Sequence, residues 1–223
     1  MKTQLPILIL GLLLSALPLS VVSQTTVYSL RSAVDLELKV AKKLKVEVTP
    51  EYRYDPVNKS GSMLVQAGVN YKLASWLSLG GYYRLDGSKT TDSENLEPAS
   101  LIISNRFALD ANAKVNLNRL TPKFRVRFSN FTDFDSGTDD KSNYLRYRVG
   151  LDYNIKGIKL TPFVSAEFYH KLSNGLFSKS RYTLGAEYEF NKHNAISAGY
   201  SYARKFKTMT NYHIFELTYR IGF

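Results

Sequence analysis

The sequence predicts an all-β protein: a transmembrane antiparallel up-and-down β-barrel preceded by an export signal. Three observations predict it. Apolar and polar residues alternate along runs of about ten residues or more, an apolar segment opens the chain, and the last alternating run ends on Phe223. Alternation with a period of two marks a strand with one apolar and one polar face. No segment after residue 24 shows the period of an amphipathic helix, so we expect little helix.

The N-terminal segment has the features of a cleaved signal peptide. Lys2 supplies a positive start, residues 5–22 are almost wholly apolar, and small residues precede an expected cleavage site before Gln24. Two prolines within the segment argue against the alternative, a transmembrane anchor. The expected organisation is therefore a signal peptide over 1–23 and one barrel domain over 24–223.

Alternating runs fill the rest of the chain. In chain order they lie near 30–40, 44–54, 62–73, 76–86, 101–115, 122–131, 145–153, 158–169, 182–190, 194–204 and 215–223. These are eleven runs, whereas single-chain bacterial barrels usually have an even number of strands. A short extra strand over 24–29 would give twelve, and loss of the 30–40 run from the wall would give ten. We therefore expect ten to twelve strands and prefer twelve.

The apolar faces are expected to meet lipid rather than a soluble core. Runs of this length suit tilted membrane-spanning strands, because strands in globular proteins average about five or six residues. Many of the sixteen tyrosines stand at the ends of the apolar faces, as in the aromatic girdles of membrane barrels. The chain has no cysteine, which excludes disulfides, thiolate metal sites and the lipid anchor of a lipoprotein.

The connections and the C-terminus indicate how the barrel is placed. Shorter and longer connections alternate along the chain, and membrane barrels have short periplasmic turns and longer extracellular loops. Alternate residues of the last run, Tyr219, Ile221 and Phe223, resemble the signal by which bacterial outer-membrane barrels engage their assembly machinery. The expected location is the outer membrane, reached through the periplasm.

The polar faces carry charged side chains that we expect to line the lumen. The candidates are Arg53, Arg84, Arg106, Arg125, Arg127, Arg146, Arg148, Arg181, Arg220, Glu47, Glu51, Asp110, Asp152, Glu167, Glu187 and Glu216. Guanidinium and carboxylate groups in a narrow lumen form two-pronged hydrogen bonds, so one interpretation is an ion-pair network that fills the barrel. The other is a selective pore, with Arg125, Arg127, Arg146 and Arg148 as an uncompensated basic strip.

These features suggest a narrow pore for small anionic solutes, since the net charge is +11. The first alternative is a closed structural barrel that binds lipopolysaccharide or a protein. The expected partners are outer-membrane lipid and lipopolysaccharide, the barrel-assembly machinery and a small anionic solute. Nucleic acid is not expected, because the aromatic residues face away from the arginines. No metal site or cofactor is expected either.

A second alternative, a lipid hydrolase, rests on the segment HKLSNGLFSKSRY at 170–182. It resembles the His-x-Ser-Asn-Gly stretch of outer-membrane phospholipase A. That family has its histidine and serine two residues apart, whereas His170 and Ser173 are three apart and would face opposite sides of a continuous strand. Tyr182 stands where the family has a downstream asparagine. We therefore expect no enzymatic activity.

Four phrases together resemble a known family. They are VEVTPEYRY at 46–54, YLRYRVGLDYNI at 144–155, LTPFVSAEFYHKL at 160–172 and SRYTLGAEYEFNKHNAISAGYSY at 180–202. Their order and spacing are similar to domain-of-unknown-function family 2490, small outer-membrane barrels of Gram-negative bacteria. The resemblance implies a barrel and an outer-membrane address, and it supplies no activity or catalytic residues.

Overall fold

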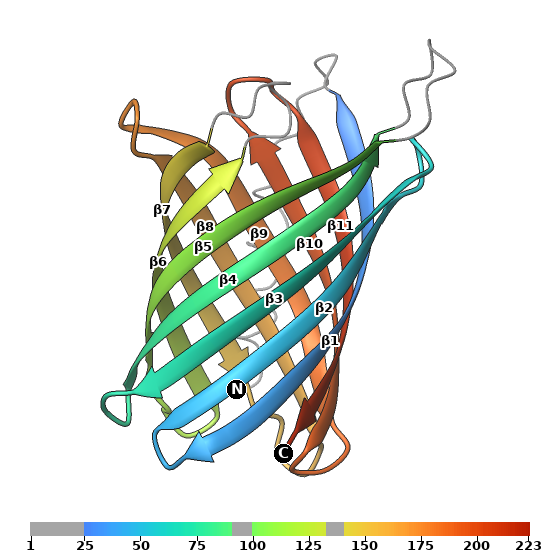
Figure 1. The fold of residues 1–223 in the computed structure, drawn as a ribbon. Coiled ribbons are helices and arrows are strands. Elements are labelled where there is room, and N and C mark those ends of the chain that lie inside the picture. The colour runs from blue at the N-terminus through green and yellow to red at the C-terminus, as the bar shows by residue number, and fades with distance from the viewer. Residues whose placement is uncertain (1–24, 91–99, 133–140) are drawn as a thin grey trace, which may run out of the picture.

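The computed structural model describes residues 25–90, 100–132 and 141–223, which form one closed β-barrel (Figure 1). The predicted signal peptide over 1–23 lies outside these ranges. Within them, no helix has the length and apolar character needed to cross a membrane. The strands are β1 (Thr26–Ala41), β2 (Leu44–Asp55), β3 (Ser60–Lys72), β4 (Leu77–Thr90), β5 (Ser100–Lys114), β6 (Leu120–Thr132), β7 (Lys141–Tyr153), β8 (Leu160–Lys171), β9 (Leu176–Glu189), β10 (Asn194–Lys205) and β11 (Asn211–Gly222).

Each strand pairs with its neighbours in the sequence, and β1 pairs with β11 to close the barrel. All pairs of consecutive strands are antiparallel. The closing pair is parallel and in register from Thr26 opposite Asn211 to Glu37 opposite Gly222. At the end of this seam the amide of Phe223 donates to the carbonyl oxygen of Glu37 at 2.8 Å. Full closure leaves no unpaired sheet edge, which a lipid environment requires.

The described part of the chain has eleven strands, within the expected range and one fewer than the preferred twelve. Residues 26–29, considered for a separate strand, instead continue into the 30–40 run as the single long strand β1. An odd number of strands in an up-and-down barrel makes the first and last strands run in the same direction. The parallel β1–β11 pair is therefore the geometric consequence of the odd count.

The two faces of the wall differ in chemistry, as the alternation predicts. Large apolar side chains stand exposed on the outer face, for example Leu184 of β9 and Leu217 of β11. Their sequence neighbours Thr183 and Glu216 make side-chain contacts across the lumen face. The predicted assembly-signal residues lie at the end of β11, where Tyr219 and Phe223 are exposed with the other outward residues.

The ends of the barrel are distinguished by the chain connections (Figure 1). We call the end that carries the C-terminus and the turns 42–43, 73–76, 115–119, 154–159 and 190–193 the C-terminal end. The opposite end carries the connections 56–59, 172–175 and 206–210. The connection between the predicted runs 158–169 and 182–190 is a tight hairpin, because β8 extends to Lys171 and β9 begins at Leu176.

Candidate functional site

Glu167 of β8 is the centre of a buried ion-pair cluster in the lumen. Its carboxylate accepts hydrogen bonds from Nη2 of Arg125 at 2.7 Å and from Nη2 of Arg146 at 3.0 Å. The hydroxyl of Tyr169 also donates to it at 3.0 Å. The guanidinium of Arg146 lies over the Tyr169 ring, 4.5 Å from its centroid. The side chain of Glu167 is only 4% exposed, so one buried carboxylate holds two guanidinium groups.

A second pair joins adjacent strands. Arg127 of β6 donates through Nε and Nη2 to the two carboxylate oxygens of Asp110 on β5, at 2.5 and 2.6 Å. The two residues are register partners, so the short two-pronged contact follows from the strand pairing. The ring of Tyr82 from β4 lies 4.8 Å from the Arg127 guanidinium. Stacking and the paired carboxylate both fix this arginine in place.

Further pairs continue around the barrel. Arg106 of β5 lies 3.1 Å from Asp86 of β4, and both side chains are buried. Nε of Arg53 donates to Glu51 on the same strand at 2.6 Å, and Nη2 of Arg84 donates to Gln66 at 2.8 Å. Glu216 of β11 is shared more loosely: Arg31 lies 3.5 Å and Arg181 4.0 Å from its carboxylate.

We call the buried inward side chains of β3 to β11 the plug. They are Leu64, Asp86, Arg106, Ala108, Asp110, Arg127, Ser129, Tyr144, Glu167, Tyr169, Ser201, Ala203 and Ile214, each at most 9% exposed. Side chains that line a water-filled channel are exposed to its water. Burial of inward residues from eight of these nine strands, all but β9, therefore means that packed side chains fill this part of the lumen.

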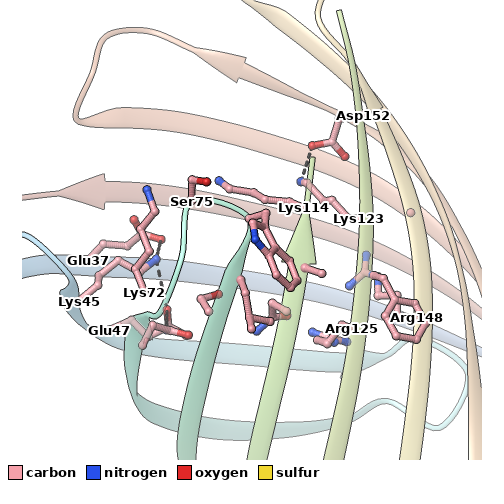
Figure 2. Close-up of a pocket in the computed structure, with 18 of the residues that line it drawn as sticks. Glu37, Lys45, Glu47, Lys72, Ser75, Lys114, Lys123, Arg125, Arg148 and Asp152 are labelled. Carbon is pink, nitrogen blue, oxygen red and sulfur yellow. Dashed lines mark hydrogen bonds and ion pairs between the residues drawn. The ribbon is translucent and has the colours of Figure 1, made fainter. Parts of the chain in front are cut away.

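A cavity of about 1150 Å³ occupies the lumen at the C-terminal end; we call it the vestibule. Turn residues such as Lys42, Lys43 and Trp76 lie at its mouth. Figure 2 shows Lys45 and Lys72 toward one side of this space, Arg125 with Arg148 toward the other, and Lys114 between them. A smaller cavity of about 310 Å³ shares Arg148, Phe163 and Ser197 with the vestibule and reaches Arg31 and Glu216. Small residues such as Ala33 and Gly199 leave the room for it.

The lining of the vestibule is strongly basic. Its ten cationic residues are Lys39, Lys42, Lys43, Lys45, Lys72, Lys114, Lys123, Arg125, Arg148 and Arg220, against the four acidic residues Glu37, Glu47, Asp152 and Glu187. Several of the charges pair. Lys45 Nζ donates to Glu37 at 2.7 Å, Arg220 Nη2 to Glu187 at 3.0 Å, and Lys123 contacts Asp152. Six positive charges remain in excess over the acidic residues.

The structure distributes the sequence-derived lumen candidates over these three places. Glu47, Arg125, Arg148, Asp152, Glu187 and Arg220 line the vestibule. Glu51 and Glu216 line the smaller cavity. Arg106, Asp110, Arg127 and Glu167 are buried in the plug. Arg53, Arg84, Arg146 and Arg181 make the inward contacts described above.

Two expectations about these residues change. The proposed basic strip is not uniform, because Arg127 and Arg146 have carboxylate partners and Arg125 shares one. The sequence candidates also omitted the seven lysines of the vestibule. A signal for them was present: Lys39, Lys72 and Lys114 stand at inward positions close to the C-terminal ends of their strands, next to the short turns.

His170, the histidine of the hydrolase alternative, lies near the end of β8. Its ring packs against Phe177 with 5.2 Å between centroids, and Phe177 is exposed among the outward residues. Ser173 lies in the tight turn after β8. No group of three or more histidine, aspartate or glutamate residues within the described ranges is arranged to hold a metal ion.

The profile of the family described as "Protein of unknown function (DUF2490)" matches residues 32–213, most of the barrel. The chain belongs to this family. The family resemblance expected from the sequence phrases is thereby confirmed, as is the closed all-β barrel. No curated protein matches the sequence.

Two solved structures are similar to this chain at low sequence identity. The translocator domain of autotransporter NalP from Neisseria meningitidis is 19% identical, with a TM-score of 0.46 over 78% of this chain and 72% of that one. A Pseudomonas aeruginosa FadL homologue is 11% identical, with a TM-score of 0.40 over 76% of this chain. The DUF2490 chain spans 59% of that homologue, less than two thirds of its length.

Proposed function

We propose that this DUF2490 protein is an outer-membrane barrel that admits small anionic solutes into its vestibule from the periplasmic side, and that its plug keeps the lumen closed. The surplus of cationic over acidic residues in the vestibule carries the proposal. A cleft lined by one sign of charge, with low-dielectric walls, concentrates the oppositely charged solute. The C-terminal end faces the periplasm in this proposal, since short turns lie there in outer-membrane barrels.

The outer-membrane location is supported by the lipid-compatible outer surface. Exposed apolar residues such as Leu38, Leu79 and Leu184 cover the wall. Exposed tyrosines occur near both ends of the strands, with Tyr71 close to the C-terminal end and Tyr28 close to the opposite end. An aromatic girdle at each interface is typical of such barrels. In this proposal the residues Tyr219, Ile221 and Phe223 engage the assembly machinery, and the outer surface contacts lipid and lipopolysaccharide.

The proposed role is non-enzymatic, because the chemistry concentrated in the lumen is ion pairing rather than an activated nucleophile. A general base must lie within hydrogen-bonding reach of its nucleophile. The ring of His170 packs against that of the exposed Phe177, and Ser173 lies in the turn after β8.

A narrow anion pore is the second candidate, and the smaller cavity favours it. That cavity extends from Arg148 along small residues to the loosely held Glu216, whose partners lie 3.5 and 4.0 Å away. These are the longest arginine contacts of the lumen described above, so this side would open most readily.

Conductance across a planar lipid bilayer separates the two candidates. The closed barrel with a vestibule is expected to give no steady single-channel steps, because the plug is packed. Steady steps with chloride preference would contradict the closure and favour the narrow pore. Steady steps with cation preference would contradict both. A barrel verified as folded by its β-sheet circular dichroism is the required input.

A further inference from the structure

Arg148 is the cation at the junction of the two cavities. It lines both the vestibule and the smaller cavity, and it is half-buried rather than packed in the plug. Its Nε donates to Ser165 Oγ at 3.2 Å, which fixes the plane of the guanidinium. The two terminal amino groups of a guanidinium held by Nε remain as a fork, the geometry that suits an oxyanion.

The charge around Arg148 is not balanced by carboxylate. Arg148 is the register partner of Arg125 on β6 and of Glu167 on β8. Glu167, however, accepts hydrogen bonds from Arg125 and Arg146. Three guanidinium groups therefore surround one carboxylate, and like charges directly opposite each other on adjacent strands repel. An anion bound at Arg148 would remove this repulsion.

An aromatic ring lies beside the same position. Phe163 lines both cavities together with Arg148. Its Cζ lies so close to the backbone of Gly185 that a Cβ there would be 2.6 Å away. The glycine thus allows the ring to approach the wall closely, and the ring supplies an apolar surface in the same two cavities that Arg148 lines. Pockets that pair a few placed polar groups with aromatic surface bind small organic ligands.

We propose that Arg148, supported by Arg125, binds the oxyanion head of a small organic anion, a carboxylate or a phosphate ester, whose apolar body lies against Phe163. This inference rests on the proposed function, because the anion reaches Arg148 through the vestibule. Arg148 is then the specificity-determining residue of the site, and the lysines at the mouth attract anions without selecting among them.

Trp76 offers the measurement. It is the single tryptophan of the chain and lines the vestibule, so its fluorescence in the full barrel reports ligands that enter. Phenyl phosphate serves as the probe, with inorganic phosphate as the head group alone and benzylammonium as the cationic counterpart. We expect a saturable change with phenyl phosphate, a weaker one with inorganic phosphate and none with benzylammonium.

Arg148→Met and its control Arg119→Met each remove one positive charge, and Arg148→Lys removes none. Arg148→Met is expected to weaken phenyl phosphate binding by about tenfold or more, since it removes a charge-assisted, two-pronged contact. Arg148→Lys keeps the charge but not the fork, and we expect a similar loss; it also serves if the Met variant does not fold. Arg119→Met removes one arginine from the exposed 115–119 turn at the same end of the barrel. It is expected to leave binding unchanged.

Iodide and caesium quenching of Trp76, with each constant divided by that of the same ion with free N-acetyltryptophanamide, distinguishes failure of this inference from failure of the proposed function. Suppose that iodide quenches more strongly than caesium. The Arg148 site is then wrong, and the vestibule stands, if phenyl phosphate gives no saturable change in fluorescence. The same conclusion follows if Arg148→Met and Arg148→Lys bind phenyl phosphate as tightly as the wild type does. If iodide does not quench more strongly than caesium, the vestibule proposal fails and the Arg148 site fails with it.

Discussion

Arg125 on β6 reaches Glu167 on β8 across the intervening strand, with 2.7 Å between Nη2 and Oε1. Both side chains are on the lumen side of the wall, so this contact crosses the inner face of β7. The buried ion pairs pack together with Tyr144, Tyr169 and Ile214, and these side chains fill this part of the lumen. The vestibule ends where this packing begins.

Replacing Glu167 by glutamine tests that arrangement. Two guanidinium groups, of Arg125 and Arg146, would lose their carboxylate in a buried setting. Breaking a buried pair by removing one partner costs about 3–5 kcal/mol. We expect the free energy of unfolding, measured in urea with lipid vesicles, to fall by about this amount.

The matched control is Glu189→Gln. Glu189 is 56% exposed and its partner Arg220 lies 3.7 Å away, and exposed pairs contribute less than about 1 kcal/mol. Equal losses in the two variants would contradict the role given to Glu167.

The Asp110–Arg127 pair tests whether a buried ion pair is stabilising in itself. Asp110→Asn alone is expected to be strongly destabilising, because Arg127 then stays buried without its carboxylate. Replacing both residues, by Asp110→Leu and Arg127→Met, is expected to cost less than the sum of the single changes. A double-mutant cycle on urea unfolding measures the difference, expected at about 0.5–3 kcal/mol. Strict additivity would show that the pair is not coupled.

Gly185 tests the close packing beside Phe163. A Cβ at this position would lie 2.5 Å from the carbonyl oxygen of Ala198, a backbone atom that cannot easily move. Gly185→Ala is expected to lower the free energy of unfolding by about 1–3 kcal/mol. At Gly81 the nearest atom would be 3.8 Å away. Gly81→Ala is therefore expected to be neutral or to stabilise by about 0.5–1 kcal/mol, and a larger loss there than at Gly185 would refute the packing argument.

The outward face is tested by arginine at lipid-facing positions. Leu184 lies in the middle portion of β9 and is 58% exposed, so Leu184→Arg is expected to cost about 2–4 kcal/mol in a bilayer. Val40 lies beside the β1–β2 turn, and Val40→Arg there is expected to cost about 0–1 kcal/mol. Unfolding measured in detergent micelles and in vesicles gives the comparison. A small cost at Leu184 in vesicles would mean that this face does not meet lipid.

Much of the fold could be predicted from alternation alone, and the limits have a physical cause. A period of two tells which side chains share a face, so the eleven runs and the inward arginines follow from it. It does not fix where a strand begins, which is why residues 26–29 were considered as an extra strand rather than the start of β1. Turn chemistry shortened the β8–β9 connection, where Gly175 takes a φ of 65°.

The site was harder to predict, because it depends on register. Arg127 and Arg148 both lie at inward positions of neighbouring strands. One meets Asp110 and the other Ser165, and only the stagger of the closed barrel decides which. The vestibule lysines were missed for the same reason: lysines near short turns lie at the mouth of a cavity only once closure brings the strand ends together.

The most direct test of the central claim is collisional quenching of Trp76 fluorescence by iodide and caesium, with neutral acrylamide as the reference for simple access. Each constant is divided by that of the same quencher with free N-acetyltryptophanamide, because iodide quenches indole intrinsically more efficiently than caesium. We expect the iodide value to exceed the caesium value by more than about twofold at low ionic strength. The excess should shrink as salt is added, since the screening length falls to about 10 Å at 0.1 M. Equal constants, or stronger quenching by caesium, would contradict a basic vestibule open to anions.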